Sequence, residues 1–323
     1  MSRPFFSVLV TVYNRSGQIA RCVSSCAAQT FEDLEIVVVD DGSTDDTLAV
    51  LDGLGEPRLR VVRHSSNRGI SPARATAAAH ATGTWLVMLD SDWELEPDAL
   101  ARLKAIIDGL PPDVRIIRSR LRADDGSLEP GVMPHGVTDY VGRLRWCDAV
   151  AAAGAASDAG HCVHRSVLDA DPLIDDRRGA VETLWELDVA RRQPSLWVSD
   201  VLGLQHTDAP NSHLRDLRAS RLVPRLLAEA PDVLWMNQTL LAEHREGLAR
   251  YAPTYRLALE ESAALEGFLA GDRRAGIRNS VTALRHGGPP ARILATAATG
   301  ILGPRSLAYA KVAGRRWRAR RNG

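Results

Sequence analysis

The stretches that decide the fold read S-V-L-V-T-V-Y-N-R from Ser7, E-I-V-V-V-D-D-G-S-T-D-D-T from Glu35, N-R-G-I-S-P-A-R from Asn67 and W-L-V-M-L-D-S-D from Trp85. Their near-continuous apolar runs are typical of strands buried on both faces of a parallel sheet. Each run ends in small, acidic or amide residues, and helical segments separate the runs. This rhythm predicts an α/β protein with a doubly wound, mostly parallel sheet.

The surrounding hydrophobic pattern predicts the other elements of this sheet. Strands are expected at 5–12, 34–39, 59–63, 84–89 and 114–120, and helices at 17–27, 44–54, 72–81 and 97–107. Residues 123–139 are expected to form a loop, and 140–192 to return to the sheet and end in a helix. Ligands of such sheets bind beyond the carboxyl ends of the strands, which is where the polar clusters fall.

The composition is that of an ordinary soluble globular protein, with 323 residues, 45% hydrophobic and 25% charged. The formal net charge is zero, which argues against nucleic acid as a partner. The four cysteines show no C-x-x-C spacing and are expected to be reduced thiols. The sequence shows no apolar leader and no run of roughly 18 apolar residues, so we expect a cytoplasmic protein without a membrane span.

Three polar side chains, Thr11, Tyr13 and Asn14, follow the first expected strand. A hydroxyl, an aromatic face and an amide are the groups needed to bind a base and its ribose. The alternative is an ordinary strand-to-helix turn that uses Asn for its tolerance of turn conformations. From these residues alone, both interpretations stay open.

Asp40 and Asp41 follow the second expected strand, and Gly42-Ser43 make the turn after it. One carboxylate can accept a hydrogen bond from a base NH or a ribose hydroxyl, while the other caps the next helix. Capping alone is the competing explanation.

Asp90-Ser91-Asp92 follows the run W-L-V-M-L. Two carboxylates at i and i+2 straddle a turn, so both can reach one cation or its water shell. Hard oxygen ligands suit Mg²⁺ or Mn²⁺, which also bridges phosphates. The tripeptide therefore predicts a divalent-cation site.

The order and spacing of all four stretches resemble the family 2 glycosyltransferases. The resemblance implies a GT-A fold and inverting transfer from a nucleoside diphosphate sugar. In that family the D-D-G-S-x-D tract binds the nucleoside, usually through its second aspartate, which favours Asp41 over Asp40. The N-x-G-x-x-x-A-R stretch matches Asn67 and Arg74, although Ala replaces the Asn that usually follows. Arg74 is expected to meet the pyrophosphate, and Ser91 completes the predicted nucleotide site.

The same resemblance implies a general base near residue 182. The segment V-E-T-L-W-E-L resembles the family's E-D-x-x-L tract, but Thr183 stands where the Asp is usual. Glu182 is the predicted base, with Glu186 and Asp176 as alternatives, because inverting attack needs one carboxylate to take the acceptor proton. The competing explanation is a set of solvated helix acids paired with neighbouring arginines. His206 is predicted as a further metal ligand through a free ring nitrogen.

The predicted function is metal-dependent transfer of a sugar, with a UDP-sugar as default donor, to an acceptor hydroxyl of a polysaccharide, glycolipid or natural-product glycan. A catalytically silent nucleotide-sugar binding protein is the alternative from another class. A nucleotidyltransferase or a dinucleotide-dependent oxidoreductase is disfavoured, because no glycine-rich loop follows the first strand.

The expected domains are a glycosyltransferase domain at 1–212, with a nucleotide-sugar half of about 1–120 and an acceptor half of about 121–212, and a helical region at 213–323. This region ends in a basic tail, Lys311 to Gly323, which follows the apolar stretch Ile293 to Ala313. Together they are expected to contact an anionic membrane at the inner face of the cell membrane. A solvated terminus is the alternative for the tail. A homodimer formed through the helical region is left open.

Overall fold

The computed structural model describes residues 3–153, 160–179, 181–206 and 219–321. It divides into two compact units. The first comprises Met1–Trp146, Ala155–Arg178 and Trp185–Ala209, and the second Cys147–Gly154, Gly179–Leu184 and Pro210–Gly323. The domain boundary expected between 212 and 213 lies outside the described residues.

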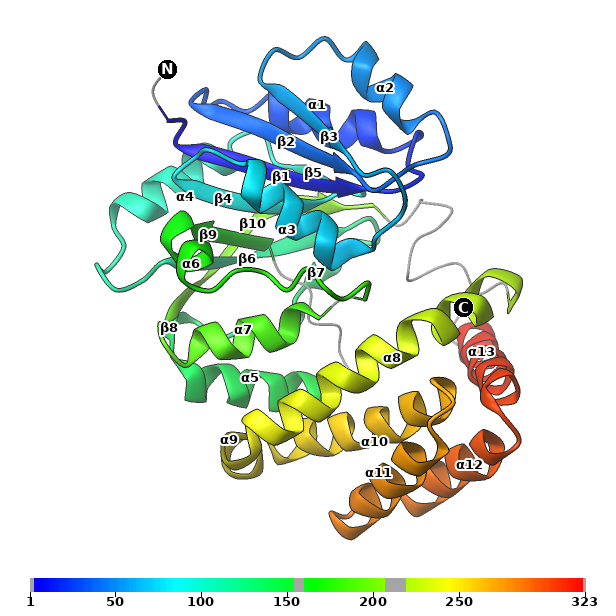
Figure 1. The fold of residues 1–323 in the computed structure, drawn as a ribbon. Helices are drawn as coiled ribbons and strands as arrows, with labels where there is room; N and C mark the ends of the chain where they lie inside the picture. Colours follow the sequence, from blue (N-terminus) through cyan, green and yellow to red (C-terminus); the bar gives the residue numbers. More distant parts are fainter. Residues whose placement is uncertain (1–2, 154–159, 180, 207–218, 322–323) are drawn as a thin grey trace. The chain divides into compact units, whose positions relative to one another are not determined.

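One mixed sheet forms the centre of the first unit (Figure 1). Its strands are β1 (Phe6–Val12), β2 (Leu34–Asp40), β3 (Leu59–Arg63), β4 (Trp85–Asp90), β5 (Trp93–Leu95), β6 (Ile116–Ala123), β7 (Leu128–Glu129), β8 (Gly136–Thr138), β9 (Gly160–His164) and β10 (Ser195–Gln205). The strand order is β3-β2-β1-β4-β9-β6-β10-β5, with β7 paired to β6 and β8 to β10.

The four strands β3-β2-β1-β4 run parallel, as the apolar runs predicted. Their register aligns the carboxyl ends, since Val12 pairs with Asp40 and Thr11 with Asp90. The polar residues that follow β1, β2 and β4 therefore meet at one edge of the sheet.

The other side of the sheet is mixed. β9 lies between β4 and β6 and runs antiparallel to both, and β5 runs antiparallel to β10, whereas β6 and β10 are parallel. An apolar run indicates burial but not direction, and the short segment G-H-C-V-H of β9 gives no sign of its antiparallel insertion. The α/β class is confirmed, with a parallel half and a mixed half.

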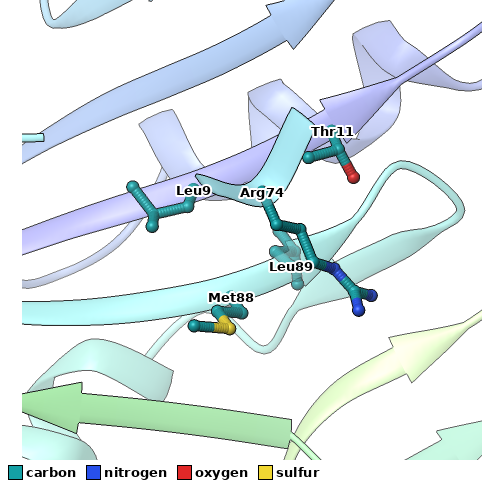
Figure 2. Close-up of a pocket in the computed structure, with 5 residues that line it drawn as sticks. All are labelled: Leu9, Thr11, Arg74, Met88 and Leu89. Atoms are coloured by element: carbon teal, nitrogen blue, oxygen red, sulfur yellow. The ribbon is translucent and has the colours of Figure 1, made fainter. Parts of the chain in front are cut away.

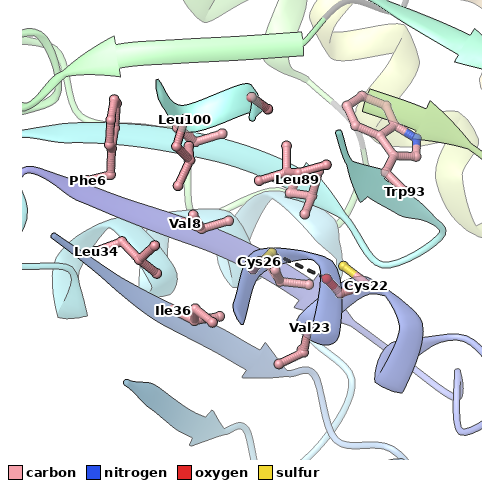
Figure 3. Packing of buried hydrophobic residues seen from close by; sticks show 14 of the residues in the cluster. Phe6, Val8, Cys22, Val23, Cys26, Leu34, Ile36, Leu89, Trp93 and Leu100 are labelled. Carbon is pink, nitrogen blue, oxygen red and sulfur yellow. Dashed lines mark hydrogen bonds between the residues drawn. The ribbon is translucent and has the colours of Figure 1, made fainter. Parts of the chain in front are cut away.

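Helices cover both faces of this sheet. They are α1 (Ile19–Ala27), α2 (Thr47–Gly53), α3 (Ile70–His80), α4 (Ala99–Asp108), α5 (Tyr140–Ala153), α6 (Arg165–Ala170) and α7 (Glu182–Ala190), and α5 and α7 each cross the boundary between the units. Alternate residues of β1 point to opposite faces. Phe6 and Val8 join α1 and α4 in one apolar cluster (Figure 3), and Leu9 joins α3 in another.

The second unit contains the helices α8 (Ala219–Glu243), α9 (Arg245–Tyr251), α10 (Pro253–Leu269), α11 (Arg273–Arg285), α12 (Pro290–Ile301) and α13 (Pro304–Arg321). Phe268 on α10 is fully buried at its centre. A side chain at Gly276 or Gly300 would collide with the Phe268 ring, so these glycines let α11 and α12 approach α10 closely. Among the described helices, none combines the length and apolarity that crossing a bilayer requires.

Candidate active site

The two aspartates of the D-S-D tripeptide lie at the carboxyl end of β4. Asp90 is the last residue of the strand, and Ser91 is buried beside it. Burial, together with the charge of Asp90, raises the pKa of Asp92 to about 6, although Arg15 and His206 oppose this shift. The structure therefore holds two carboxylates close enough to repel each other, which is a donor set suited to a divalent cation.

Arg74 approaches Asp90 from helix α3. Its Nη2 atom donates to Asp90 Oδ1 over 2.8 Å. Both side chains stay partly exposed, at 21% and 29%. Arg74 also lines a small pocket, which Figure 2 shows. Its volume of about 10 Å³ is roughly the space of one water molecule. It is lined by Leu9, Thr11, Arg74, Met88 and Leu89. The structure thus brings together the residues predicted for pyrophosphate and for metal.

Asp41 organises the loop that carries Asn67. Its Oδ1 atom accepts from the Arg68 N–H over 2.8 Å, and its Oδ2 atom from the Gly69 N–H over 2.8 Å. His64 Nδ1 lies 2.7 Å from the same Oδ1 atom, and the carboxylate is buried. These contacts fix the loop that follows β3.

Asp40 holds the turn after β2 and does not cap helix α2, whose N-cap residue is Asp46. It is fully buried, and its Oδ1 atom accepts from the Ser43 N–H over 3.1 Å. Arg63 Nε lies 3.5 Å from its other oxygen. These contacts place Asp40 beneath the turn, while its predicted part in nucleotide binding stays a prediction.

His64 was missed from the sequence. Its ring bridges Asp41 and Thr76, with Nε2 3.0 Å from Thr76 Oγ1. The available signal was its position directly after the third expected strand, where polar residues face the ligand edge. The tract quoted from Asn67 begins three residues too late to include it.

Asn14 joins the end of β1 to the D-D-G-S tract. It has φ 52°, its N–H donates to Ser43 Oγ, and its Oδ1 atom accepts from the Thr44 N–H over 2.8 Å. The amide thus has the turn role given as its alternative. Tyr13 beside it is 41% exposed at the same edge, so its ring is accessible for stacking.

Asn67 is held by Arg178. Arg178 Nη1 donates to the Asn67 carbonyl over 2.6 Å, and Nη2 donates to its Oδ1 atom over 2.5 Å. Gly69, two residues later, has φ +104° and lies directly against the Arg178 backbone. The N-x-G segment is therefore braced by the chain ahead of α7.

His206 lies next to the D-S-D turn. Its backbone N–H donates to the Asp92 carbonyl over 2.9 Å. Its Nε2 atom is 2.6 Å from Glu94 Oε1, and Nδ1 is 2.9 Å from Asp124 Oδ1. Both ring nitrogens thus face carboxylates, so His206 lacks the free nitrogen on which its prediction as a ligand relied.

Glu186 sits in a buried cationic cluster. Arg118 Nη1 lies 2.8 Å from its Oε1 atom, and Arg143 donates to its other oxygen. Despite burial, these arginines hold the pKa of Glu186 well below its usual value. Burial and Arg118 lower the pKa of His161 to about 3, so its ring is neutral beside this cluster. A carboxylate of such low basicity is a poor general base, which weighs against Glu186 in that role.

Glu182 and Asp176 are the other two acids predicted as the base. Glu182 is half-buried, is the first residue of α7 and belongs to the second unit. Asp176 has a 70% exposed side chain that lies 3.7 Å from Arg177. The assignment of Glu182 stays a prediction.

An α/β unit with helices on both faces of its sheet, an Asp-x-Asp turn after β4, an α3 arginine bonded to the first of these aspartates and an aspartate-held loop beside it has the features of the GT-A class of glycosyltransferases. Residues 7–139 match the model of the family described as Glycosyl transferase family 2. Over these residues the predicted resemblance to the family 2 glycosyltransferases is confirmed.

Curated relatives share this part of the chain. Chondroitin synthase of Escherichia coli is 44% identical over 99 residues, which are 30% of this chain and 14% of that protein. The succinoglycan biosynthesis protein ExoO of Rhizobium meliloti (strain 1021) is 38% identical over 100 residues, 31% of this chain and 29% of that protein. A PGL/p-HBAD biosynthesis glycosyltransferase of Mycobacterium bovis is 39% identical over 112 residues, 33% and 43% of the two chains. The chain spans less than half the length of each.

Solved structures share the fold over most of the chain. S. aureus TarS has a TM-score of 0.57 at 18% identity, covering 92% of this chain and 54% of that one. TarS 1–349 in complex with UDP-GlcNAc has a TM-score of 0.56 at 18% identity, covering 88% and 92%. The mannosyltransferase PcManGT from Pyrobaculum calidifontis, in complex with GDP-Man and Mn2+, has a TM-score of 0.51 at 20% identity, covering 97% and 86%. These likenesses establish the GT-A fold.

Proposed function

We propose that the chain catalyses metal-dependent, inverting transfer of a sugar from a nucleoside diphosphate sugar to an acceptor hydroxyl. The observation that carries this proposal is the meeting of Asp90, Asp92 and Arg74 at the carboxyl end of β4 within the family 2 domain. Carboxylates for a cation and a guanidinium for phosphate are the groups that departure of a nucleoside diphosphate requires.

The nucleotide is assigned to the edge formed by β1, β2 and the loop after β3. Tyr13 offers an exposed ring, Thr11 a hydroxyl, and Asp41 holds the loop of Asn67 in place. A UDP-sugar is the proposed donor, supported by the likeness to TarS in complex with UDP-GlcNAc. PcManGT is in complex with GDP-Man, so the base is the first property to measure.

The cation is assigned to Asp90 and Asp92. Their mutual repulsion, which raises the pKa of Asp92, fits a site completed by positive charge. When bound, Mn²⁺ or Mg²⁺ supplies Lewis-acid stabilisation of the departing diphosphate. The Mn2+ in the PcManGT complex supports this choice of ion. His206 joins the site only if it exchanges a carboxylate partner for the metal.

Glu182 is the proposed general base. As the acceptor oxygen attacks the anomeric carbon, Glu182 takes the hydroxyl proton, and the bond to the diphosphate oxygen breaks on the opposite face. Arg74 orients the diphosphate through its fork of donors. The low basicity of Glu186 and the exposure of Asp176 support this order of preference.

The proposed acceptor is a hydroxyl group of a glycan or glycolipid. This molecule would be synthesised at the cytoplasmic side of the cell membrane. The relatives named for chondroitin, succinoglycan and PGL/p-HBAD synthesis support this class. The 1–212 and 213–323 domain division, the membrane contact of the tail from Lys311 and a homodimer stay proposals of the same kind.

The proposal is tested by measuring release of UDP from a panel of UDP-sugars in the presence of glycan acceptors. Each UDP-sugar is assayed once with Mn²⁺ and once with EDTA. Turnover that needs the metal and is lost in Asp92→Asn is the expected result. The absence of the usual Asp at Thr183 favours one second candidate, a silent nucleotide-sugar binding protein. Metal-dependent binding without turnover across the panel would favour that candidate.

A further inference from the structure

The outward face of helix α12 is apolar except for Arg292. Ile293 and Gly300 point into the unit, whereas the exposed positions of the helix and its C-cap recur at three- and four-residue spacing on the other side. Apart from Arg292, those exposed residues are Pro290, Ala291, Leu294, Ala295, Ala298, Ile301 and Leu302. Leu302 is 76% exposed and Leu294 58%. A helix on the surface of a water-soluble protein normally shows polar residues there.

Helix α11 continues this pattern with a charged rim. Ile277 and Val281 are exposed one turn apart, and Arg273 and Arg285 lie one further turn along the same stripe at either end. α11 and α12 are consecutive, and both pack against α10 (Figure 1). We call the exposed residues of these two helices the α11–α12 face.

The charged residues of α11 and α12 themselves are all arginines. From Arg273 to the end of the chain the sequence contains no Asp or Glu. Four arginines of α11, namely Arg273, Arg274, Arg278 and Arg285, are exposed and form no ion pair among the described residues. Arg292 and Lys311 pair with Glu261 and Glu266 of α10. The apolar stripe is thus bordered by uncompensated positive charge.

We propose that the α11–α12 face docks on the surface of an anionic lipid bilayer. Leu294, Ile301 and Leu302 would enter the headgroup boundary while the arginines of α11 meet lipid phosphates, the arrangement of interfacial amphipathic helices. A second copy fits less well. A two-fold interface places the same patch on both partners, so the arginines of α11 would face arginines, with only Asp272 at the N-cap as a carboxylate on this helix.

Most of the α12 part of this face lies within the apolar stretch from Ile293 to Ala313 that precedes the basic tail, and helix α11 extends it beyond that stretch. The face does not depend on the transfer reaction. Its side chains lie on two well-packed helices of the second unit rather than in the last residues of the chain. If the chain does transfer sugars, the face would hold it beside a lipid-linked acceptor.

Sedimentation of the full chain with phosphatidylcholine vesicles, with and without phosphatidylglycerol, tests the proposal. The parent should partition to the anionic vesicles. The double variant Leu294→Ser with Ile301→Ser should partition at least about tenfold less, because two exposed apolar side chains lose their burial. Arg274→Gln with Arg278→Gln should lose about fivefold per arginine, and only on anionic vesicles.

The matched control is Val137→Ser, which removes an apolar side chain that is 51% exposed on β8 and should partition like the parent. Thermal unfolding and nucleotide binding of all variants should match the parent, since every change is on the surface. Equal partition of the Leu294→Ser and Ile301→Ser double variant and the parent would overturn the proposal. So would a parent dimer that this variant converts to a monomer, because the face would then join two copies.

Discussion

Arg74 Nη2 lies 2.8 Å from Asp90 Oδ1, which ties helix α3 to the carboxyl end of β4. The guanidinium predicted for the pyrophosphate and the carboxylate predicted for the cation are therefore in direct contact. In the proposed reaction, binding of a cation and a diphosphate would redistribute this pair, because the two groups neutralise each other here. Arg74 would then turn its donors from a carboxylate to a phosphate.

Replacement of Arg74 by Gln should lower the affinity for a nucleoside diphosphate about tenfold or more, because a charge-assisted hydrogen bond is lost. Calorimetric titration in the presence of Mn²⁺ measures this. Arg60→Gln is the control, since Arg60 is exposed on β3 and its Nη1 atom donates to the His80 carbonyl, away from the aspartates of the site. An equal loss in both variants would mean that Arg74 acts through overall charge rather than through contact.

Replacement of Glu182 by Gln should reduce kcat about 10²–10⁴-fold, because a general base is removed while shape is kept. Nucleotide affinity should not change. Asp176→Asn is the matched control and should retain parental kcat, since its side chain is 70% exposed. A Glu182→Gln enzyme as fast as the parent would remove Glu182 from the mechanism.

Replacement of Gly69 by Ala should destabilise the protein by about 1–3 kcal/mol and weaken nucleotide binding. Its φ of +104° disfavours any side chain, and a Cβ there would collide with the Arg178 backbone. Urea unfolding measures the change. Gly53→Ala is the control, because a Cβ on Gly53 meets nothing within 4 Å. Similar stabilities for both variants would show that this loop is not braced as described.

Because of the cluster of Glu186 with Arg118 and Arg143, the free energy of unfolding should decrease as the pH falls into the acid range. The arginines lower the pKa of Glu186 in the folded protein. Its contribution to the free energy of unfolding is therefore complete above the ordinary pKa of 4.5 and is lost as the pH falls below that value. His161, with a folded pKa of about 3 against 6.5 ordinarily, adds to the loss, because the unfolded chain takes its proton first.

Glu186→Gln should therefore lower the free energy of unfolding at neutral pH by about 3 kcal/mol, since two buried arginines lose their carboxylate. The variant should also show a smaller further loss below about pH 4.5 than the parent. Urea unfolding across pH measures both effects. Parallel pH profiles for the two proteins would contradict the assignment.

The parallel half of the sheet and its ligand edge followed from sequence because apolar runs report burial and polar residues mark strand ends. The direction of β9 could not be predicted, since a strand of five residues carries no signal of its direction. The network of Arg118, Arg143 and Glu186 joins residues 43 to 68 positions apart, so spacing along the chain could not reveal it. The fixed partners of Asp41 escaped prediction for the same reason, because they come from the loop after another strand.

Binding of UDP, dTDP, GDP and CDP, each with Mn²⁺ and with EDTA, to the parent and to Asp92→Ala tests the central claim most directly. We expect one nucleotide, UDP first, to bind with Mn²⁺ and to lose its affinity in EDTA and in the variant. Such a result would establish the donor site at Asp90 and Asp92. If none of the nucleotides binds the folded parent under either condition, the glycosyltransferase proposal is contradicted.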